Sequence, residues 1–184
     1  MHSYGQQQNV ILVDEQGQPI GEMEKMAAHV SGELHLAFSV LLYRRTSAGV
    51  EFLLQQRALG KYHSEGLWTN TCCSHPEHNE TILAAAVRRL KQEVHINAEK
   101  MLLKELGSFI YRAELDNNLI EHELDHVVCA EIDDVEYELN PEEVMAVRWW
   151  PEAELSEELS QHPERFTAWF SQVLSFTQKA ISVV

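Results

Sequence analysis

Apolar residues in the middle of the chain alternate or cluster over short segments, a pattern typical of β-strands. These segments are rich in β-branched and aromatic residues and are bounded by turn-forming residues, which favours strands over helices. The RRTSAG sequence predicts a β-hairpin between two of them, and the DNN sequence predicts a turn between another two. The segments predicted as strands cover residues 9–14, 36–43, 50–57, 102–115, 119–132 and 143–150.

A second pattern, with apolar residues three or four positions apart, predicts helices around the strand-rich region. The clearest helix covers residues 81–94, with Asn79 as its predicted N-cap. Two more helices are predicted over residues 151–159 and 163–181. We therefore predict an α+β fold, a mixed β-sheet with helices packed on both faces. The last helix carries an apolar stripe formed by Phe166, Trp169, Phe170, Val173 and Leu174.

The chain length and composition indicate one folded domain. With 184 residues and 45% hydrophobic residues, the chain can bury a sizeable core without disulfides. No internal repeat, low-complexity tract or linker marks a domain boundary. We expect a single domain over residues 1–184.

Charge narrows the range of partners. The chain has 29 acidic and 14 basic residues, a net charge of −15, which disfavours binding to nucleic acid. An anionic small molecule would need a local group of Lys and Arg side chains. The first ten residues have no signal-peptide pattern, and no apolar run is long enough to cross a bilayer. We expect a cytoplasmic protein without a membrane partner.

The cysteines do not fit a disulfide framework or a structural zinc site. Cys72 and Cys73 are adjacent, and Cys129 is the third cysteine. A bridge between neighbouring residues would be strained, and no CxxC motif supplies sulfur ligands for zinc. We expect reduced thiols, with Cys72 as a small packing residue.

Acidic side chains recur at every second position of the IEHELDH segment. On a strand, Glu121, Glu123 and Asp125 would project from one face. Neighbouring carboxylates repel each other unless the face is wet or holds a cation. This segment alone favours a solvated outer face, and a cation-binding face is the alternative.

Three histidines lie near the predicted strands. His29 and His35 precede the strand at 36–43, and His75 follows the cysteine pair. A single histidine is more often a surface or core residue than a ligand. Three imidazoles with two carboxylates would suit a divalent ion, but spacing alone does not bring these segments together.

Two further pairs of charged residues have both a structural and a functional interpretation. Arg57 and Lys61 are four residues apart and could clamp an anion. Arg89 and Glu93 could form an i,i+4 ion pair, or bind a phosphate and its metal ion. Such pairs most often lie on a solvated surface.

The region from Ser74 to His95 resembles a degraded Nudix signature, G-x5-E-x7-R-E-U-x-E-E-x-G-U, where U is a bulky aliphatic residue. Arg89 and Gln92 replace two of its glutamates, and Ser74 and His95 replace its glycines. Nudix hydrolases use these glutamates to hold the divalent ions that activate water, so diphosphate binding fits better than hydrolysis. The signature is matched at Glu80, Arg88, Leu90 and Glu93.

Together with the segments TNTCCSHP, RALGK, AAHVSGELHLAFS, LIEHE and FTAWF, this signature makes the chain resemble type 1 isopentenyl-diphosphate isomerases. The resemblance covers residues from about 9 to about 175. It implies a Nudix-like sheet between helices and an enzyme of isoprenoid biosynthesis. The implied reaction interconverts isopentenyl and dimethylallyl diphosphates. Protonation at C4 and deprotonation at C2 proceed through a tertiary carbocation-like state.

The resemblance also implies roles for individual residues. Cys73 and Glu123 correspond to the catalytic pair, and Glu93 to the residue serving a magnesium ion that bridges to the diphosphate. The diphosphate contacts correspond to Arg57, Lys61 and Arg89, and the aromatic contacts to Tyr111 and Trp169. The ligands of a second site, for Mn²⁺, Zn²⁺ or Mg²⁺, correspond to His29, His35, His75, Glu121 and Glu123.

The chemistry of the implied reaction explains these residue types. Protonating an alkene requires an acid, a base and a dry pocket, because water would trap the cation. The indole of Trp169 could stabilise the positive charge through its π face. We expect a monomer acting on a small isoprenoid diphosphate, with a dimer as the alternative. The rival functions are a Nudix-type diphosphate hydrolase and a non-catalytic metal-binding or regulatory domain.

Overall fold

The computed structural model describes residues 8–182. Most of the opening segment, for which no signal peptide is predicted, lies outside the described residues. None of the helices in the described part combines the length and apolar character needed to span a membrane. The strands are β1 (Asn9–Val13), β2 (Pro19–Glu24), β3 (His35–Thr46), β4 (Gly49–Arg57), β5 (Trp68–Thr69), β6 (Cys72–Ser74), β7 (Lys104–Glu114), β8 (Ile120–Glu131) and β9 (Val144–Pro151). The α-helices are α1 (Lys25–Ser31), α2 (Ile82–Val94), α3 (Glu152–Gln161) and α4 (Phe170–Ile181).

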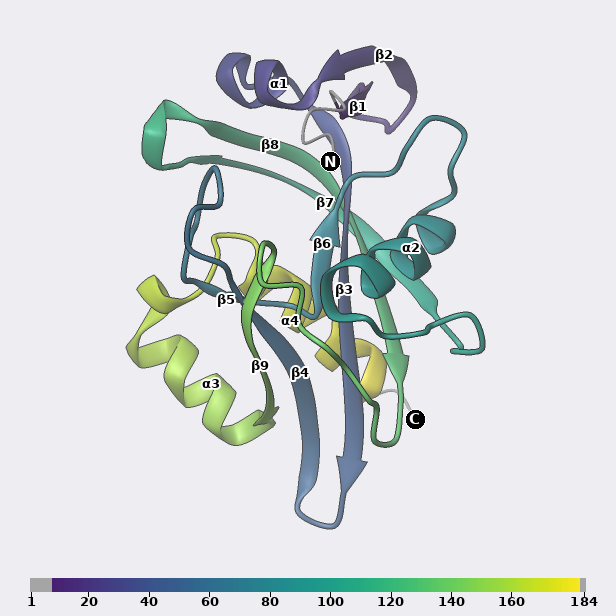
Figure 1. Ribbon diagram of the computed structural model, residues 1–184, viewed down its shortest axis with the longest axis vertical. Helices are drawn as coiled ribbons and strands as arrows, with labels where there is room; N and C mark the ends of the chain where they lie inside the picture. Colours follow the sequence, from purple (N-terminus) through teal and green to yellow (C-terminus); the bar gives the residue numbers. More distant parts are fainter. Residues whose placement is uncertain (1–7, 183–184) are drawn as a thin grey trace.

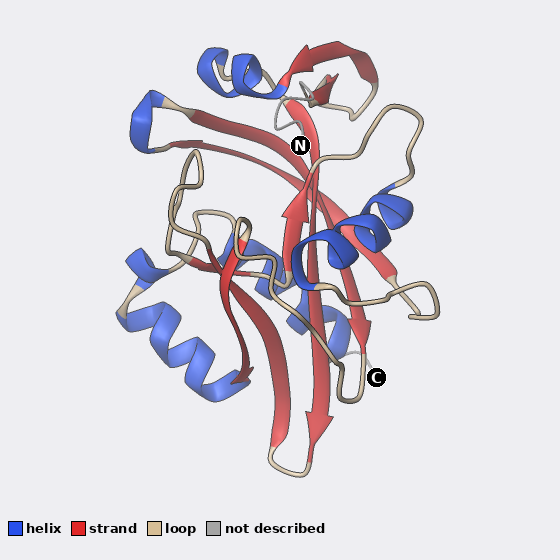
Figure 2. Ribbon diagram, in the orientation of Figure 1, coloured by secondary structure: helices blue, strands red, loops and turns tan. Residues whose placement is uncertain are grey.

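Strand β3 is the centre of the architecture. Within the described residues the nine strands form one sheet (Figure 2), in which β3 pairs in parallel with β8 and antiparallel with β4 and β6. The predicted mixed sheet is therefore confirmed. Because β3 lies between β6 and β8, it brings Cys73 on one side close to the acidic residues on the other.

Helices cover both faces of the sheet, as the α+β prediction requires. Figure 1 shows α2 in front of the sheet and α4 behind it. Alternation along β3 explains this arrangement, because neighbouring side chains point to opposite faces. Val40 and Leu42 pack in one core with Leu90 of α2, whereas Leu41 packs in the other with Phe170 of α4.

The predicted hairpin is confirmed, but its turn is tighter than the RRTSAG break suggests. The strands pair up to Thr46 and Gly49, which leaves a two-residue loop. Arg44 belongs to β3 and forms an ion pair of 2.6 Å with Glu51 on β4. This cross-strand pair accounts for polar residues within the strand.

The helix expected over residues 81–94 is present as α2, but its predicted N-cap is wrong. Thr81 caps the helix, since its hydroxyl accepts from the Ala84 N–H at 3.2 Å. Asn79 has a φ of 60° and belongs to the preceding turn. At the other end His95 adopts a left-handed conformation, φ 52°, where the Nudix signature has glycine.

The helix predicted over residues 163–181 is wrong in its first part. Pro163–Arg165 form a short 3₁₀ helix, and α4 begins only at Phe170. Between them the Thr167 N–H donates to the Trp68 carbonyl at 3.0 Å, so the chain is tied to the edge of the sheet. This bond places Trp169 just before α4, in a buried position.

Strand β2 and helix α1 were not predicted. The carboxylate of Glu24 accepts from the Ala27 N–H at 2.8 Å and caps the start of α1, and Gly32 ends the helix with a φ of 73°. Only glycine adopts that conformation readily, so Gly32 was a usable sequence signal. Helix α1 lies beside β1 and β2 (Figure 1) and carries His29.

Candidate active site and metal centre

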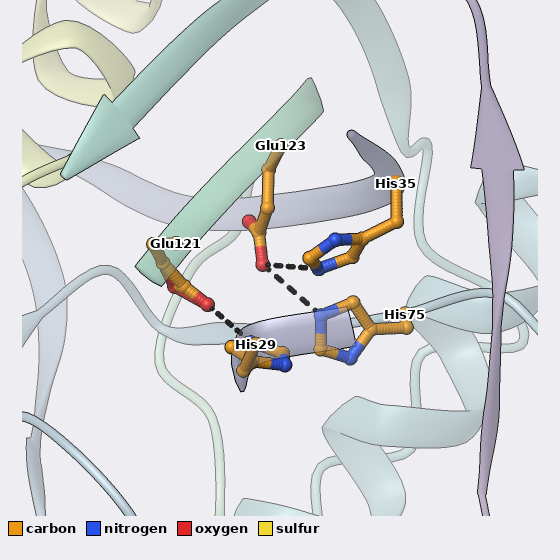
Figure 3. Close-up of side chains that lie close together, drawn as sticks. All are labelled: His29, His35, His75, Glu121 and Glu123. Atoms are coloured by element: carbon orange, nitrogen blue, oxygen red, sulfur yellow. Dashed lines mark hydrogen bonds and ion pairs between the residues drawn. The ribbon is translucent and has the colours of Figure 1, made fainter. Parts of the chain in front are cut away.

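Five side chains from four separate parts of the chain meet in one buried cluster (Figure 3), which we call the His/Glu cluster. One potential ligand atom from each residue lies within 4.8 Å of those of all the others. The histidines come from α1, the start of β3 and the residue after β6, and both glutamates come from β8. The members are His29, His35, His75, Glu121 and Glu123.

The register between β3 and β8 builds the centre of this cluster. His35 pairs directly with Glu123 across the two parallel strands. Glu121, Glu123 and Asp125 share one face of β8, as predicted, but this face is buried, with at most 6% exposure for any of the three. The solvated outer face favoured by the segment alone is therefore wrong, because imidazoles from other elements cover the two glutamates and Ser39 contacts Asp125.

Backbone carbonyls fix the orientation of two imidazoles. Nδ1 of His29 lies 2.7 Å from the Lys25 carbonyl, and Nδ1 of His35 lies 2.8 Å from the Glu33 carbonyl. A carbonyl can only accept, so each Nδ1 carries the proton and each Nε2 directs its lone pair into the cluster. The facing atoms are carboxylate oxygens, 2.7 Å from His29 and 3.3 Å from His35.

A bound cation would relieve the repulsion between these imidazole lone pairs and the carboxylate oxygens that face them. Nε2 of His35 is buried and has no hydrogen-bond partner among the described residues. A histidine that donates its other N–H to a backbone carbonyl is the usual arrangement of a metal ligand. Three imidazoles and two carboxylates also suit a divalent ion by ligand type. The residues therefore fit divalent metal binding.

The pKa values of His75 and Glu121 favour metal-binding protonation states, whereas the neighbouring Glu123 raises the pKa of His35 despite the burial of this imidazole. Burial is the main cause that lowers the pKa of His75, to about 4, which keeps this imidazole neutral near pH 7. Burial would raise the pKa of Glu121, but the nearby imidazoles of His29 and His63 outweigh it and hold the pKa well below its usual range. Neutral imidazoles and ionised carboxylates are the forms that bind metals.

Cys73 and Glu123, the predicted catalytic pair, line the same cavity. Burial raises the pKa of the Cys73 thiol, although Arg57 acts against this shift. Glu123 accepts a hydrogen bond of 2.8 Å from the Tyr111 hydroxyl. The cavity is also lined by Arg57, Tyr62, His63, Ser74, His75, Glu121 and Trp169.

Arg57 and Trp169 lie beside the thiol. Nη1 of Arg57 is 4.0 Å from Sγ of Cys73, and its guanidinium lies 5.9 Å from the centre of the Trp169 ring. The indole N–H of Trp169 donates to Asn70 Oδ1 at 3.2 Å, which fixes the ring. The structure thus brings Arg57 to the thiol, and its predicted diphosphate contact stays a prediction.

Glu93 is a buried residue of α2 and lies outside the His/Glu cluster. It accepts from Arg89 at 2.6 Å and from Gln55 at 2.7 Å. The i,i+4 pair considered from sequence is therefore formed. Gln55 was missed as a site residue, since a glutamine within a strand gives no sequence signal.

Lys61 and Arg89 form ion pairs with the partly buried carboxylate of Glu143, and Lys25 lies 4.6 Å from the centre of the Tyr62 ring, which Lys61 also approaches to 5.9 Å. We call Lys25, Lys61 and Arg89 the cationic group. Glu143 lies 2.5 Å from Lys61 and 3.5 Å from Arg89. Burial, followed by the charge of Lys61, lowers the pKa of Lys25, and Glu143 acts in the opposite direction. Lys25 and Glu143 were both missed from sequence, because they come from α1 and from the turn before β9.

Two other buried polar residues lie close to the glutamates of the His/Glu cluster; His63 was missed, and Asp125 was predicted only as part of the acidic face of β8. His63 faces Glu121 from the loop after β4, with 3.4 Å between Nε2 and Oε1. Asp125 accepts from the Ser39 hydroxyl at 2.7 Å, and burial together with the charge of Glu123 raises its pKa well above the usual range. Cys72 is buried in the core beneath α2 and all three thiols are free, in agreement with the sequence analysis.

Known proteins resemble this chain in fold and in sequence. The NUDIX domain family matches residues 33–170. Among solved structures, the Nudix domain of Shewanella oneidensis NrtR has a TM-score of 0.61 at 16% identity, covering 79% of this chain and 87% of its own. The Nudix hydrolase RenU of M. smegmatis has a TM-score of 0.58 at 17% identity, covering 95% of each chain. These two similarities concern the fold alone.

Closer relatives carry a more specific name. A protein of Photobacterium profundum named isopentenyl-diphosphate Delta-isomerase is 56% identical over 96% of this chain and 97% of its own length. A protein of Aliivibrio fischeri with the same name is 54% identical over 89% of this chain and 91% of its own. The chain therefore belongs to the type 1 isopentenyl-diphosphate isomerase family of the Nudix superfamily.

Proposed function

We propose that this chain is an enzyme that interconverts isopentenyl diphosphate and dimethylallyl diphosphate. Relatives that match this chain over nearly their whole length are named after this activity. The observation that carries the mechanism is the shared cavity of Cys73 and Glu123. These two groups are held on β6 and β8, on either side of β3, so a small alkene between them could meet both.

The proposed reaction needs one proton delivered to C4 and one removed from C2. Burial keeps the Cys73 thiol protonated, while the imidazoles of His35 and His75 lower the pKa of Glu123 against burial and the charge of Glu121. The pair then carries a single proton, as the reaction requires. Because the reaction is reversible, each group donates in one direction and accepts in the other.

The surrounding side chains would stabilise the carbocation and hold the two proton-transfer groups in place. Trp169 and Arg57 cover the thiol side of the cavity, and the indole face would stabilise positive charge developing at C3. Tyr111 holds Glu123 by its hydroxyl, at 2.8 Å. The aromatic rings of Tyr62 and Trp169 in the cavity lining would also limit access of water to the carbocation.

The His/Glu cluster would hold a divalent ion, with Mn²⁺, Zn²⁺ and Mg²⁺ as candidates by ligand type. When bound, such an ion supplies positive charge that tunes the proton affinity of Glu123. The chain's own contribution is to present three imidazoles and two carboxylates in a preformed, buried arrangement.

The diphosphate would bind at the cationic group. Lys61 and Arg89 already pair with one protein carboxylate, Glu143, and Lys25 lies within reach of the same charges, which supports binding of an anion there. Glu93 is the proposed ligand of a magnesium ion accompanying the diphosphate. Binding energy from this remote part of the substrate would be used to fix the alkene in the cavity.

Diphosphate hydrolysis is the weaker alternative. Arg89 and Gln92 occupy positions of the Nudix glutamate cluster, and Arg89 forms an ion pair with Glu93, one of its remaining glutamates. We further propose a monomer, with a dimer as the alternative, that acts in the cytoplasm.

The product formed from isopentenyl diphosphate tests this proposal. With Mg²⁺ and Mn²⁺ present, we expect dimethylallyl diphosphate by proton NMR and no release of inorganic phosphate. Phosphate release without the isomer would contradict the proposal and favour the hydrolase.

A further inference from the structure

His63 is a fourth imidazole at the His/Glu cluster, but it comes from a loop and differs from the other three. Its side chain is 2% exposed, and its ring stacks 5.7 Å from the ring of His29. Nε2 points at Oε1 of Glu121 from 3.4 Å and has no hydrogen-bond partner within the described part of the chain. A buried, unpartnered nitrogen directed at a carboxylate calls for a function.

The hydrogen-bond partner of Nδ1 separates His63 from His29. Nδ1 of His29 faces a carbonyl, which forces the proton onto Nδ1 and leaves a lone pair on Nε2. Nδ1 of His63 faces the Ser64 hydroxyl at 3.0 Å, and a hydroxyl can donate as well as accept. His63 can therefore keep its proton on Nε2 and donate to Glu121, which neutral His29 cannot do.

Among the groups around Glu121, His63 is the one placed to donate a hydrogen bond to Oε1. Oε2 of Glu121 lies 3.4 Å from the Tyr111 hydroxyl, whose shorter bond of 2.8 Å goes to Glu123. Oε1 faces the imidazoles of His29 and His63. If the lone pair of His29 binds an ion, His63 is the remaining donor to this oxygen.

We propose that His63 is a positioning residue of the metal centre, whose Nε2–H donates to Glu121 and holds that carboxylate in the orientation that binds the ion. Carboxylate ligands are usually oriented by such a hydrogen bond, and losing an outer-shell partner weakens metal binding about 10- to 100-fold. The backbone supports this position, because the His63 carbonyl accepts from Arg57 Nη2 at 3.1 Å. This contact survives substitution of the side chain.

Titration of the metal-free full-length protein with Mn²⁺, in competition with a chelator of known affinity, tests the proposal. His63→Phe preserves an aromatic ring beside Tyr62 and Trp169 but removes the donor, and we expect Mn²⁺ binding about 10- to 100-fold weaker. His63→Gln retains an N–H donor, so its affinity should lie nearer to the wild type than to His63→Phe. Ser64→Ala, which frees Nδ1, should give a smaller loss.

Three outcomes would overturn the inference. Equal Mn²⁺ affinity in the wild type and His63→Phe would show that no donor is needed. Equal loss in His63→Gln and His63→Phe, with unchanged melting temperatures of the metal-free proteins, would remove the role of the N–H group. Four imidazole ligands by X-ray absorption of the Mn²⁺ protein would make His63 a ligand itself.

The inference rests on the proposed metal centre, and the two can fail separately. If wild-type protein does not bind Mn²⁺, the metal centre itself is wrong. If the wild type binds Mn²⁺ and the His63 variants bind it equally well, only the role of His63 is wrong.

Discussion

The His/Glu cluster and the cationic group lie in the same molecule but are built in opposite ways. The cluster uses histidine and glutamate side chains, four of them on helix α1 and strands β3 and β8, and two of its imidazoles are fixed by backbone carbonyls. The cationic group uses long side chains, of which Lys61 and Arg89 are 17% and 15% exposed and already paired with Glu143. The first arrangement suits an ion and proton transfer that need fixed geometry. The second suits a charged group that enters and leaves.

The largest expected effect concerns Cys73 and Glu123, the second of which belongs to the His/Glu cluster. Cys73→Ala and Glu123→Gln each remove one of the two proposed proton-transfer groups, and we expect kcat to fall about 100- to 10,000-fold or more. Steady-state kinetics with isopentenyl diphosphate measures this loss. Cys72→Ala is the matched control, because the neighbouring thiol is buried in the core and should be dispensable for turnover.

Loss of one cation is expected to have the next largest effect. Arg89→Ala removes a charge-assisted contact worth about 1.5–3 kcal/mol, so kcat/KM should fall about 10- to 100-fold, mainly through KM. Arg45→Ala serves as a control, since Arg45 is 43% exposed and lies at the end of β3 that is far from His35. An unchanged KM in Arg89→Ala would show that the diphosphate binds elsewhere.

Removing the carboxylate of Glu143 should change KM in the opposite direction. Glu143→Gln takes away the charge that a diphosphate must replace, and the affected pairs are worth about 1 kcal/mol or less. We expect KM to fall by up to about fivefold, with kcat preserved. A rise in KM would instead mean that Glu143 organises the cations for the substrate.

The smallest expected signal is the alkylation of Cys73 near neutral pH. Burial raises the pKa of this thiol, so the reactive thiolate is scarce at pH 7 and 8. The rate of modification by iodoacetamide, followed by mass spectrometry of the Cys73 peptide, should still rise about tenfold per pH unit beyond pH 9. A rate that levels off below pH 8 would reveal a lowered pKa instead.

Periodicity predicted what depends on local sequence. The alternation of Glu121, Glu123 and Asp125 on one face follows from strand geometry, and the faces of β3 and α2 follow in the same way. Whether the acidic face is buried depends on imidazoles from α1, β3 and the segment after β6, which no local pattern reveals. Resemblance to a family supplied that grouping, and the structure brings the five side chains together.

Other features were missed because tertiary contacts decide them. The hydrogen bond from Thr167 to Trp68 delays the start of α4, although the apolar stripe continues through Trp169. His63 lies in a loop, where no periodicity marks a side chain as buried. The position of Gly32 after α1 was a readable signal, and using it would have placed His29 on a helix.

Solvent deuterium incorporation tests the central claim, proton exchange through Cys73 and Glu123, most directly. The reaction of isopentenyl diphosphate is run in deuterium oxide with the wild type, Cys73→Ala and Glu123→Gln, and followed by NMR. The wild type should place deuterium from solvent in a methyl group derived from C4 of the dimethylallyl product, and neither variant should incorporate it. Incorporation at the wild-type rate in either variant would contradict the account.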